Sequence, residues 1–269
     1  MTKRASVSAA CILFVIFLAA AAAFAILLPE ASGKETRHDG KLTVDCSNAS
    51  QGYIMVKGPQ TKKKLKVRVK KGEQTLNYDL NGKGEYEVYP LQYGKGKYQI
   101  ILYGNVSGNR YAEEGRVGIN AEMENELSCY LYPNQYVNYD ENTEAAIAAG
   151  EICAGLETET EKWNAVCNYV KQHFTYDFRK AFLVQKGTLP DIDTTWKEKM
   201  GICQDLSAVT VCMLRSVGVP ARLNIGTVGP NNFHAWVTAV VDGKEKMFDP
   251  TVEAGGITKN QKYTTDRCY

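Results

Sequence analysis

The stretch that decides the fold is Gly201-Ile-Cys-Gln-Asp-Leu-Ser-Ala-Val-Thr-Val-Cys-Met-Leu-Arg-Ser-Val-Gly-Val-Pro220. Apolar residues recur within it at helical spacing. Gly218 followed by Pro220 is typical of the end of a helix. The pattern therefore predicts a helix that begins within Gly201-Ile-Cys-Gln-Asp205 and runs to about Ser216.

Cys203 occupies the first turn of this predicted helix. The unpaired N–H groups and the helix dipole at that position stabilise a negative charge, which favours the thiolate. The thiolate is the nucleophilic form of cysteine, and Gly201 lets the backbone approach closely just before it. A buried, unreactive cysteine is the alternative, so Cys203 taken alone is only a candidate nucleophile.

A hairpin follows the helix. Residues 233–241 and 244–249 predict two strands, and Asp242-Gly243 between them is a tight turn. With a two-residue turn, His234 and Asp249 lie on one face of the sheet as diagonal neighbours, about 7–8 Å apart at the backbone. An imidazole beside a carboxylate is the base and orienting group that a nucleophile needs. A shift of one residue in the turn would place the two side chains on opposite faces.

Five blocks between about residues 160 and 255 together resemble the transglutaminase-like superfamily, whose members have a papain-like cysteine-protease fold. The blocks are Tyr176-Asp177, Gly201-Ile-Cys-Gln-Asp205, Leu214-Arg-Ser-Val-Gly-Val-Pro-Ala-Arg222, His234-Ala-Trp-Val237 and Phe248-Asp-Pro-Thr251. The resemblance implies that Cys203 is the nucleophile, His234 the base and Asp249 the orienting carboxylate. It also implies acyl transfer through a thioester.

The sequence departs from the family pattern at two positions. Asp205, two residues after the cysteine, resembles the microbial, extracytoplasmic branch. Animal transglutaminases carry Trp directly after the cysteine, whereas this chain has Gln204. This difference favours a peptidase or amidase over a cross-linking enzyme. Lys197 stands where the papain family has a Gln that stabilises the oxyanion, so the backbone N–H of Cys203 is the one donor that we expect. Gln204 is a candidate substrate-binding residue.

Trp236 shares the predicted sheet face of His234 and is the second candidate substrate-binding residue. It would form a wall of the cleft. Packing in the core beneath the helix is the alternative.

The chain before residue 127 has a different character. Leu65, Val67 and Val69 alternate with basic residues, and Asn81-Gly82 marks a turn between strands. Beyond residue 127, Thr158-Glu-Thr-Glu161 is a capping box that begins an amphipathic helix. We therefore predict an α+β protein in which a small antiparallel, Ig-like β-sandwich precedes a papain-like/transglutaminase-like catalytic domain. The predicted divisions are a leader over 1–33, the sandwich over 34–127 and the catalytic domain over 128–269.

The N-terminus carries a membrane signal. Lys3 and Arg4 precede an apolar run from Ala9 to Leu28, which is long enough to span a bilayer as a helix. The charged end is expected to stay in the cytoplasm, which places the rest of the chain outside it. The run is either a retained anchor that ties the protein to the membrane or a signal peptide cleaved near 31–33.

Cysteine usage and charge limit the other classes of function. Seven cysteines follow the leader, an odd number that leaves at least one thiol free, and their pairing is open. The chain has no CxxC spacing and only three His, so we expect no metal and no cofactor. A net charge of +2 gives no reason to expect nucleic acid.

A basic stretch lies within the predicted sandwich. Its side chains would either contact an anionic polymer of the cell envelope or form a solvated strand face that resists edge pairing. The residues are Lys62, Lys63, Lys64, Lys66 and Arg68.

The expected function is thus hydrolysis of amide bonds in a protein or cell-wall peptide. The alternative is a non-catalytic, envelope-anchored binding module in which the sandwich makes the contacts.

Overall fold

The computed structural model describes residues 26–230, 232–255 and 262–269. The apolar run from Ala9, on which the leader prediction depends, lies outside the described residues up to residue 25. Among the residues that are described, no helix is both long and apolar enough to cross a membrane.

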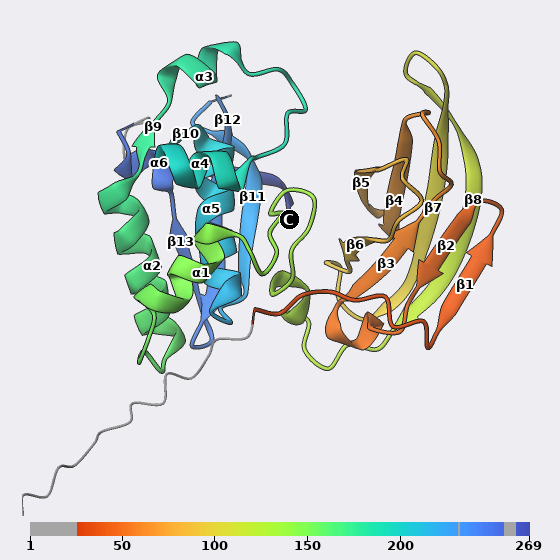
Figure 1. The fold of residues 1–269 in the computed structure, drawn as a ribbon, viewed down its shortest axis with the longest axis horizontal. Helices are drawn as coiled ribbons and strands as arrows, with labels where there is room; N and C mark the ends of the chain where they lie inside the picture. The colour runs from red at the N-terminus through yellow and green to blue at the C-terminus, as the bar shows by residue number, and fades with distance from the viewer. Residues whose placement is uncertain (1–25, 231, 256–261) are drawn as a thin grey trace, which may run out of the picture.

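The first part of the described chain consists of two four-stranded antiparallel sheets (Figure 1). Alternating residues of their strands are buried, as in Leu65–Lys71, because the two sheets share one apolar layer between them. The first sheet has the order β1 (Thr36–Asp39), β2 (Leu42–Asp45), β3 (Tyr53–Lys57), β6 (Glu87–Pro90). The second has the order β5 (Gln74–Leu80), β4 (Leu65–Lys71), β7 (Gly96–Ser107), β8 (Arg110–Ala121).

Two residues of the basic stretch, Lys66 and Arg68, lie on the interior strand β4, and the other three precede it. Because β4 is hydrogen-bonded to β5 on one side and to β7 on the other, its charges do not protect a sheet edge, and that interpretation is wrong. Lys66 forms an ion pair with Asp79 at 2.5 Å. Arg68 stacks on the ring of Tyr103 and donates a hydrogen bond to Asn77. These partners account for two of the basic side chains within the fold itself.

The second part of the chain is built around a buried helix, α5 (Cys203–Ser216). It contacts β11 and β12 on one side, and α1, α2 and α4 elsewhere (Figure 1). Its predicted bounds are confirmed. The other helices are α1 (Glu144–Ile152), α2 (Glu159–His173), α3 (Phe178–Leu183), α4 (Ile192–Glu198) and α6 (Pro250–Glu253), with short 3-10 helices η1 (Ala49–Gln51) and η2 (Ser128–Tyr130). The predicted capping box at Thr158 and Glu161 begins α2.

One antiparallel sheet supports this helix. Its order is β13 (Lys244–Phe248), β12 (Asn232–Val241), β11 (Ala221–Val228), β14 (Tyr263–Cys268). A two-stranded parallel ladder joins β9 (Thr175–Tyr176) to β10 (Met200–Gly201), directly before α5.

The two parts meet near the C-terminus, which lies between them in Figure 1. The side-chain amide of Gln92 donates to the carbonyl of Cys268 at 3.0 Å, and the ring of Tyr78 meets that of Tyr269 edge-on at 5.7 Å. The α+β fold class with a β-rich N-terminal region is thereby confirmed. The division at residue 127 stays a prediction; the last strand of the first part ends at Ala121.

Candidate active site

Cys203 is the first residue of α5. The parallel pairing of β10 with β9 holds the segment just before it, and the carbonyl of Gly201 accepts the N–H of Asp177 at 3.0 Å. The first N–H groups of a helix have no acceptor within that helix, so they are available to a negative charge beside the thiol. The side chain of Cys203 is nearly buried, with 9% of the residue exposed.

His234 joins Cys203 to Asp249. Its Nε2 lies 2.8 Å from Oδ2 of Asp249. The thiol of Cys203 lies close enough to the imidazole to raise the pKa of His234. The structure therefore brings together the three side chains that the sequence singled out, and their roles as nucleophile, base and orienting carboxylate stay a prediction.

The hairpin arithmetic is confirmed in its register and wrong in one detail. Val241 pairs with Lys244 and Val237 with Phe248, as a two-residue turn requires. Asp249, however, is not a strand residue, because β13 ends at Phe248. The chain turns there into α6, whose first residue, Pro250, has no N–H to continue a ladder.

Asp249 instead caps the N-terminus of α6. Its Oδ1 accepts the N–H groups of Thr251 at 2.9 Å and Val252 at 3.3 Å, and this fixes the carboxylate. Oδ2 remains directed at His234. The cap thus orients the group that orients the imidazole.

The charges of the site reinforce one another. Burial by itself lowers the pKa of His234, but the hydrogen bonds and charges of Asp249 and Cys203 outweigh it and raise the pKa from 6.5 to about 9. Burial by itself would raise the pKa of Asp249. The hydrogen bond and ion pair with His234 outweigh it, so the pKa of Asp249 lies below its ordinary value. At neutral pH the arrangement therefore favours a protonated imidazole beside an ionised carboxylate.

Tyr263 is a fourth member of the cluster that the sequence did not indicate. Its hydroxyl donates to Oδ2 of Asp249 at 2.6 Å, and its ring meets that of Trp236 edge-on at 5.0 Å. Tyr263 reaches the site because its strand, β14, pairs with β11. The hairpin of β12 and β13 separates these two strands in the sequence. A pairing at such separation leaves no local pattern in the sequence.

Residues 147–247 match the family model of the transglutaminase-like superfamily. The match spans Cys203 and His234, and it ends just before Asp249. These residues form a transglutaminase-like domain. No curated protein matches the chain at a significant level.

Solved structures similar to the chain are distant from it. A proposed cysteine protease from Cytophaga hutchinsonii is 14% identical, with a TM-score of 0.40 over 74% of this chain and 78% of that one. The periplasmic domain of TgpA from Pseudomonas aeruginosa is 15% identical, with a TM-score of 0.38 over 84% and 77%. Red sea bream transglutaminase is 12% identical, with a TM-score of 0.31 over 74% of this chain and 48% of that one. All three TM-scores lie below 0.5, so we base the assignment of the domain on the family match.

The two candidate substrate-binding residues of the transglutaminase-like domain lie in different surroundings. The side-chain amide of Gln204 donates to the carbonyl of Thr188 at 2.9 Å, which ties the loop after α3 to the residue after the nucleophile. Trp236 is 2% exposed and stacks beside His234, with ring centroids 6.2 Å apart. Trp236 therefore supports the imidazole from within the domain, which is the core packing given above as the alternative.

Asp205 is completely buried in the first turn of α5. Its Oδ2 accepts the N–H of Ile202 at 3.1 Å and forms an ion pair with Lys180 of α3 at 2.7 Å. A side chain added at Gly201 would meet Cβ of Asp205 at 2.8 Å. Glycine is thus required there so that the carboxylate can fit against the turn that presents the thiol.

Lys199 ends α4 in a left-handed backbone conformation, with φ of 53°. Its Nζ lies 2.9 Å from the ring centroid of Trp196 and 4.9 Å from that of Phe174, where cation–π attraction holds it. Burial lowers the pKa of Lys199. Its carbonyl accepts the N–H of Thr175 at 3.0 Å, which begins the ladder between β9 and β10.

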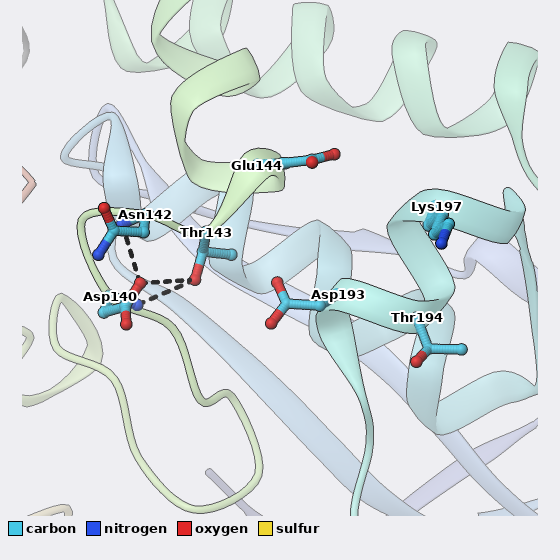
Figure 2. A pocket seen from close by; sticks show the side chains of 7 residues that line it. All are labelled: Asp140, Asn142, Thr143, Glu144, Asp193, Thr194 and Lys197. Carbon is cyan, nitrogen blue, oxygen red and sulfur yellow. Dashed lines mark hydrogen bonds between the residues drawn. The ribbon is translucent and has the colours of Figure 1, made fainter.

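Figure 2 shows a surface pocket of about 370 Å³ between α1 and α4. Its lining is acidic, and it also contains Lys197, so this lysine lies in a pocket that does not include Cys203 or His234. Burial raises the pKa of Asp193, and the charges of Asp191, Asp140 and Glu144 raise it further. No three His, Cys, Asp or Glu side chains in the described ranges are arranged to hold a metal ion.

The seven cysteines of the described chain are all free thiols. Six of them are buried, and Cys268 is partly exposed. Burial raises the pKa of Cys167 and of Cys212, and no histidine is among the leading influences on either pKa. The proximity of the imidazole of His234 distinguishes Cys203 from these two buried thiols.

Proposed function

We propose that the protein is a thiol hydrolase that cleaves amide bonds through Cys203, His234 and Asp249. The observation that carries the proposal is the position of His234, whose Nε2 lies 2.8 Å from Oδ2 of Asp249 and whose pKa is raised by both Asp249 and the thiol of Cys203. A cysteine that only packs in the core does not require a base beside it. A histidine with only a structural role does not require a buried carboxylate such as Asp249, which is itself held by two N–H groups.

The reaction follows from these positions. The thiolate of Cys203 attacks the carbonyl carbon of the amide, and the N–H groups at the start of α5 stabilise the oxygen that becomes negative. The imidazolium of His234 gives its proton to the nitrogen as the carbon–nitrogen bond breaks, and the amine leaves. His234 then takes a proton from water, which attacks the thioester and releases the acid and the thiolate. Asp249 holds the ring throughout and stabilises its positive charge.

Hydrolysis is favoured over cross-linking because Gln204 follows the nucleophile where animal transglutaminases carry Trp. The side chain of Gln204 is engaged with the carbonyl of Thr188. The substrate class in this proposal is a protein or cell-wall peptide.

The test is the reactivity of Cys203 in the full-length protein. Iodoacetamide near neutral pH should alkylate Cys203 at least about tenfold faster than it alkylates glutathione, because the start of a helix and a neighbouring imidazole activate a thiol as a nucleophile. His234→Gln should remove the difference. His173→Gln is the matched control, since His173 is an exposed histidine that stacks on Tyr169. The site of alkylation is mapped by peptide mass spectrometry.

Equal rates for Cys203 and glutathione would refute the activated nucleophile. Cys203→Ala should also abolish release of amine from peptide substrates. Amine release that persists in Cys203→Ala would refute Cys203 as the nucleophile, whereas absence of amine release even in the wild type would favour the non-catalytic binding module.

The extracytoplasmic location is part of the proposal and rests on the charge before the apolar run of the N-terminus. Labelling of intact cells with a membrane-impermeant amine reagent tests it. Lysines of the sandwich should be labelled without lysis. Labelling that requires lysis contradicts the proposed location but leaves the chemistry of Cys203 unaffected.

A further inference from the structure

The helix α3 presents apolar side chains to solvent. Phe182 is 90% exposed, Phe178 66% and Leu183 62%, and none of the six residues of α3 is buried. Phe178 and Phe182 are four residues apart and therefore lie on the same side of the helix. Exposed apolar clusters of this kind mark places where another molecule binds. We call Tyr176, Phe178, Phe182 and Leu183 the apolar rim.

The apolar rim is fastened to the segment that carries the nucleophile. The N–H of Asp177 donates to the carbonyl of Gly201, two residues before Cys203. Lys180 forms its ion pair with Asp205, two residues after Cys203. α3 is therefore fixed on both sides of the nucleophile, and Figure 1 shows it beyond the end of the domain where α5 begins.

The loop that follows α3 is attached at a third point, where Thr188 accepts the amide of Gln204. Val184 to Asp191 are otherwise largely exposed. The three attachments named here, from α3, the residue before it and this loop, all reach residues within two positions of Cys203.

The rim is continuous with the candidate active site through Tyr176. The ring of Tyr176 meets that of Phe178 edge-on at 5.0 Å. In the parallel ladder of β9 and β10, Tyr176 pairs with Gly201, two residues before Cys203. Burial raises the pKa of Tyr176, and Cys203 raises it further. The apolar side chains thus extend outward from the nucleophile, which is where the residues that flank a bound amide must lie.

We propose that the apolar rim binds an aromatic or large aliphatic side chain of a polypeptide substrate, next to the amide that Cys203 attacks. The inference rests on the proposed function and specifies its substrate. A lipid surface is the competing occupant, because Arg179 and Lys186 accompany the rim. The attachments to Gly201, Gln204 and Asp205 favour the substrate, since a membrane contact has no reason to be fixed around the nucleophile.

The experiment uses dipeptide vinyl sulfones that are identical except for one side chain, which is Phe, Gly or Glu. Each probe adds its vinyl carbon to the thiolate and takes up one proton, so intact mass reports the rate of modification of Cys203 in the full-length protein. The Phe probe should react about tenfold faster than the Glu probe, because transfer of an aromatic side chain onto an apolar surface is favourable. Each rate is divided by the rate with iodoacetamide, which reports thiol reactivity without recognition.

Phe182→Ser should reduce the preference for Phe over Glu to about threefold or less and leave the iodoacetamide rate unchanged. Phe182 is suitable because its exposure makes the substitution harmless to folding. Val106→Ser is the matched control, since Val106 is 65% exposed on β7 and distant in sequence from the site. It should leave both rates as they are in the wild type.

The inference is overturned if wild type and Phe182→Ser show the same preference for the Phe probe over the Glu probe. Loss of binding to vesicles of phosphatidylglycerol in Phe182→Ser, with the probe preference unchanged, also overturns it and assigns the rim to a membrane. Failure of the proposed function looks different, because Cys203 would then react slowly with every probe and with iodoacetamide.

Discussion

Replacing Asp249 by Asn is the most informative perturbation of the candidate active site. Asn retains an oxygen that can cap α6 and has nearly the shape of Asp, so the main change is loss of the charge beside His234. The hydrogen bond and charge of Asp249 are, after burial, the leading influences on the pKa of His234. Their removal should let burial dominate and lower the pKa of His234 by more than about one unit.

The magnitude follows from the interval between the ordinary pKa of histidine and that of His234. The rise from 6.5 to about 9 corresponds to about 3 kcal/mol, because one pKa unit is worth about 1.4 kcal/mol. Since the folded pKa is raised, this stabilisation is fully present below pH 6.5 and is lost as pH rises through about 9. Asp249→Asn should therefore lower the free energy of unfolding by up to about 3 kcal/mol at pH 6 and by less at pH 10.

The assay is NMR of the imidazole Cε1–H groups, combined with urea unfolding at pH 6 and pH 10. The chain has only three histidines, so His234 is assigned by substituting His38 and His173 in turn. Asp193→Asn is the matched control, because Asp193 lines the pocket in Figure 2 and should leave His234 unchanged. A wild-type His234 that titrates near 6.5, or one that titrates equally in Asp249→Asn, would refute the reasoning.

Three further outcomes are expected. Cys203→Ala should also lower the pKa of His234, because the nearby thiol contributes to raising that pKa; an unchanged NMR titration would contradict this influence. Tyr263→Phe should raise the pKa of Asp249 and shift acid unfolding to higher pH, since a lowered carboxyl pKa gives stability that is lost as pH falls through it; thermal unfolding between pH 2 and 5 measures this. Lys199→Met should cost about 1 kcal/mol in urea unfolding through loss of the cation–π contact with Trp196, and a change below the error of the measurement would show that the ring contributes packing alone.

The sequence predicted the elements whose signals are local. The helix from Cys203 to Ser216 follows from apolar spacing and from the Gly and Pro at its end. The hairpin register follows from a two-residue turn, which fixes which residues face each other. The helix pattern places the thiol at the start of a helix, and the hairpin register places His234 close to Asp249.

The tertiary structure corrected two predictions whose outcome depends on a neighbouring helix or strand. Asp249 leaves the strand because Pro250 begins a helix, and the carboxylate is fixed by the cap of that helix rather than by the sheet. The basic residues of β4 proved to lie on an interior strand, since the order of strands in a sheet is set by contacts between distant segments.

The thiolate chemistry proposed for Cys203, His234 and Asp249 was readable from the sequence because helix starts and tight turns are determined by neighbouring residues. Only the tertiary structure supplied Tyr263, which arrives from a strand near the C-terminus, and the apolar rim, whose exposure depends on what the rest of the chain leaves uncovered. Burial and pairing between distant strands are properties of the packed chain, and no short stretch of sequence contains them.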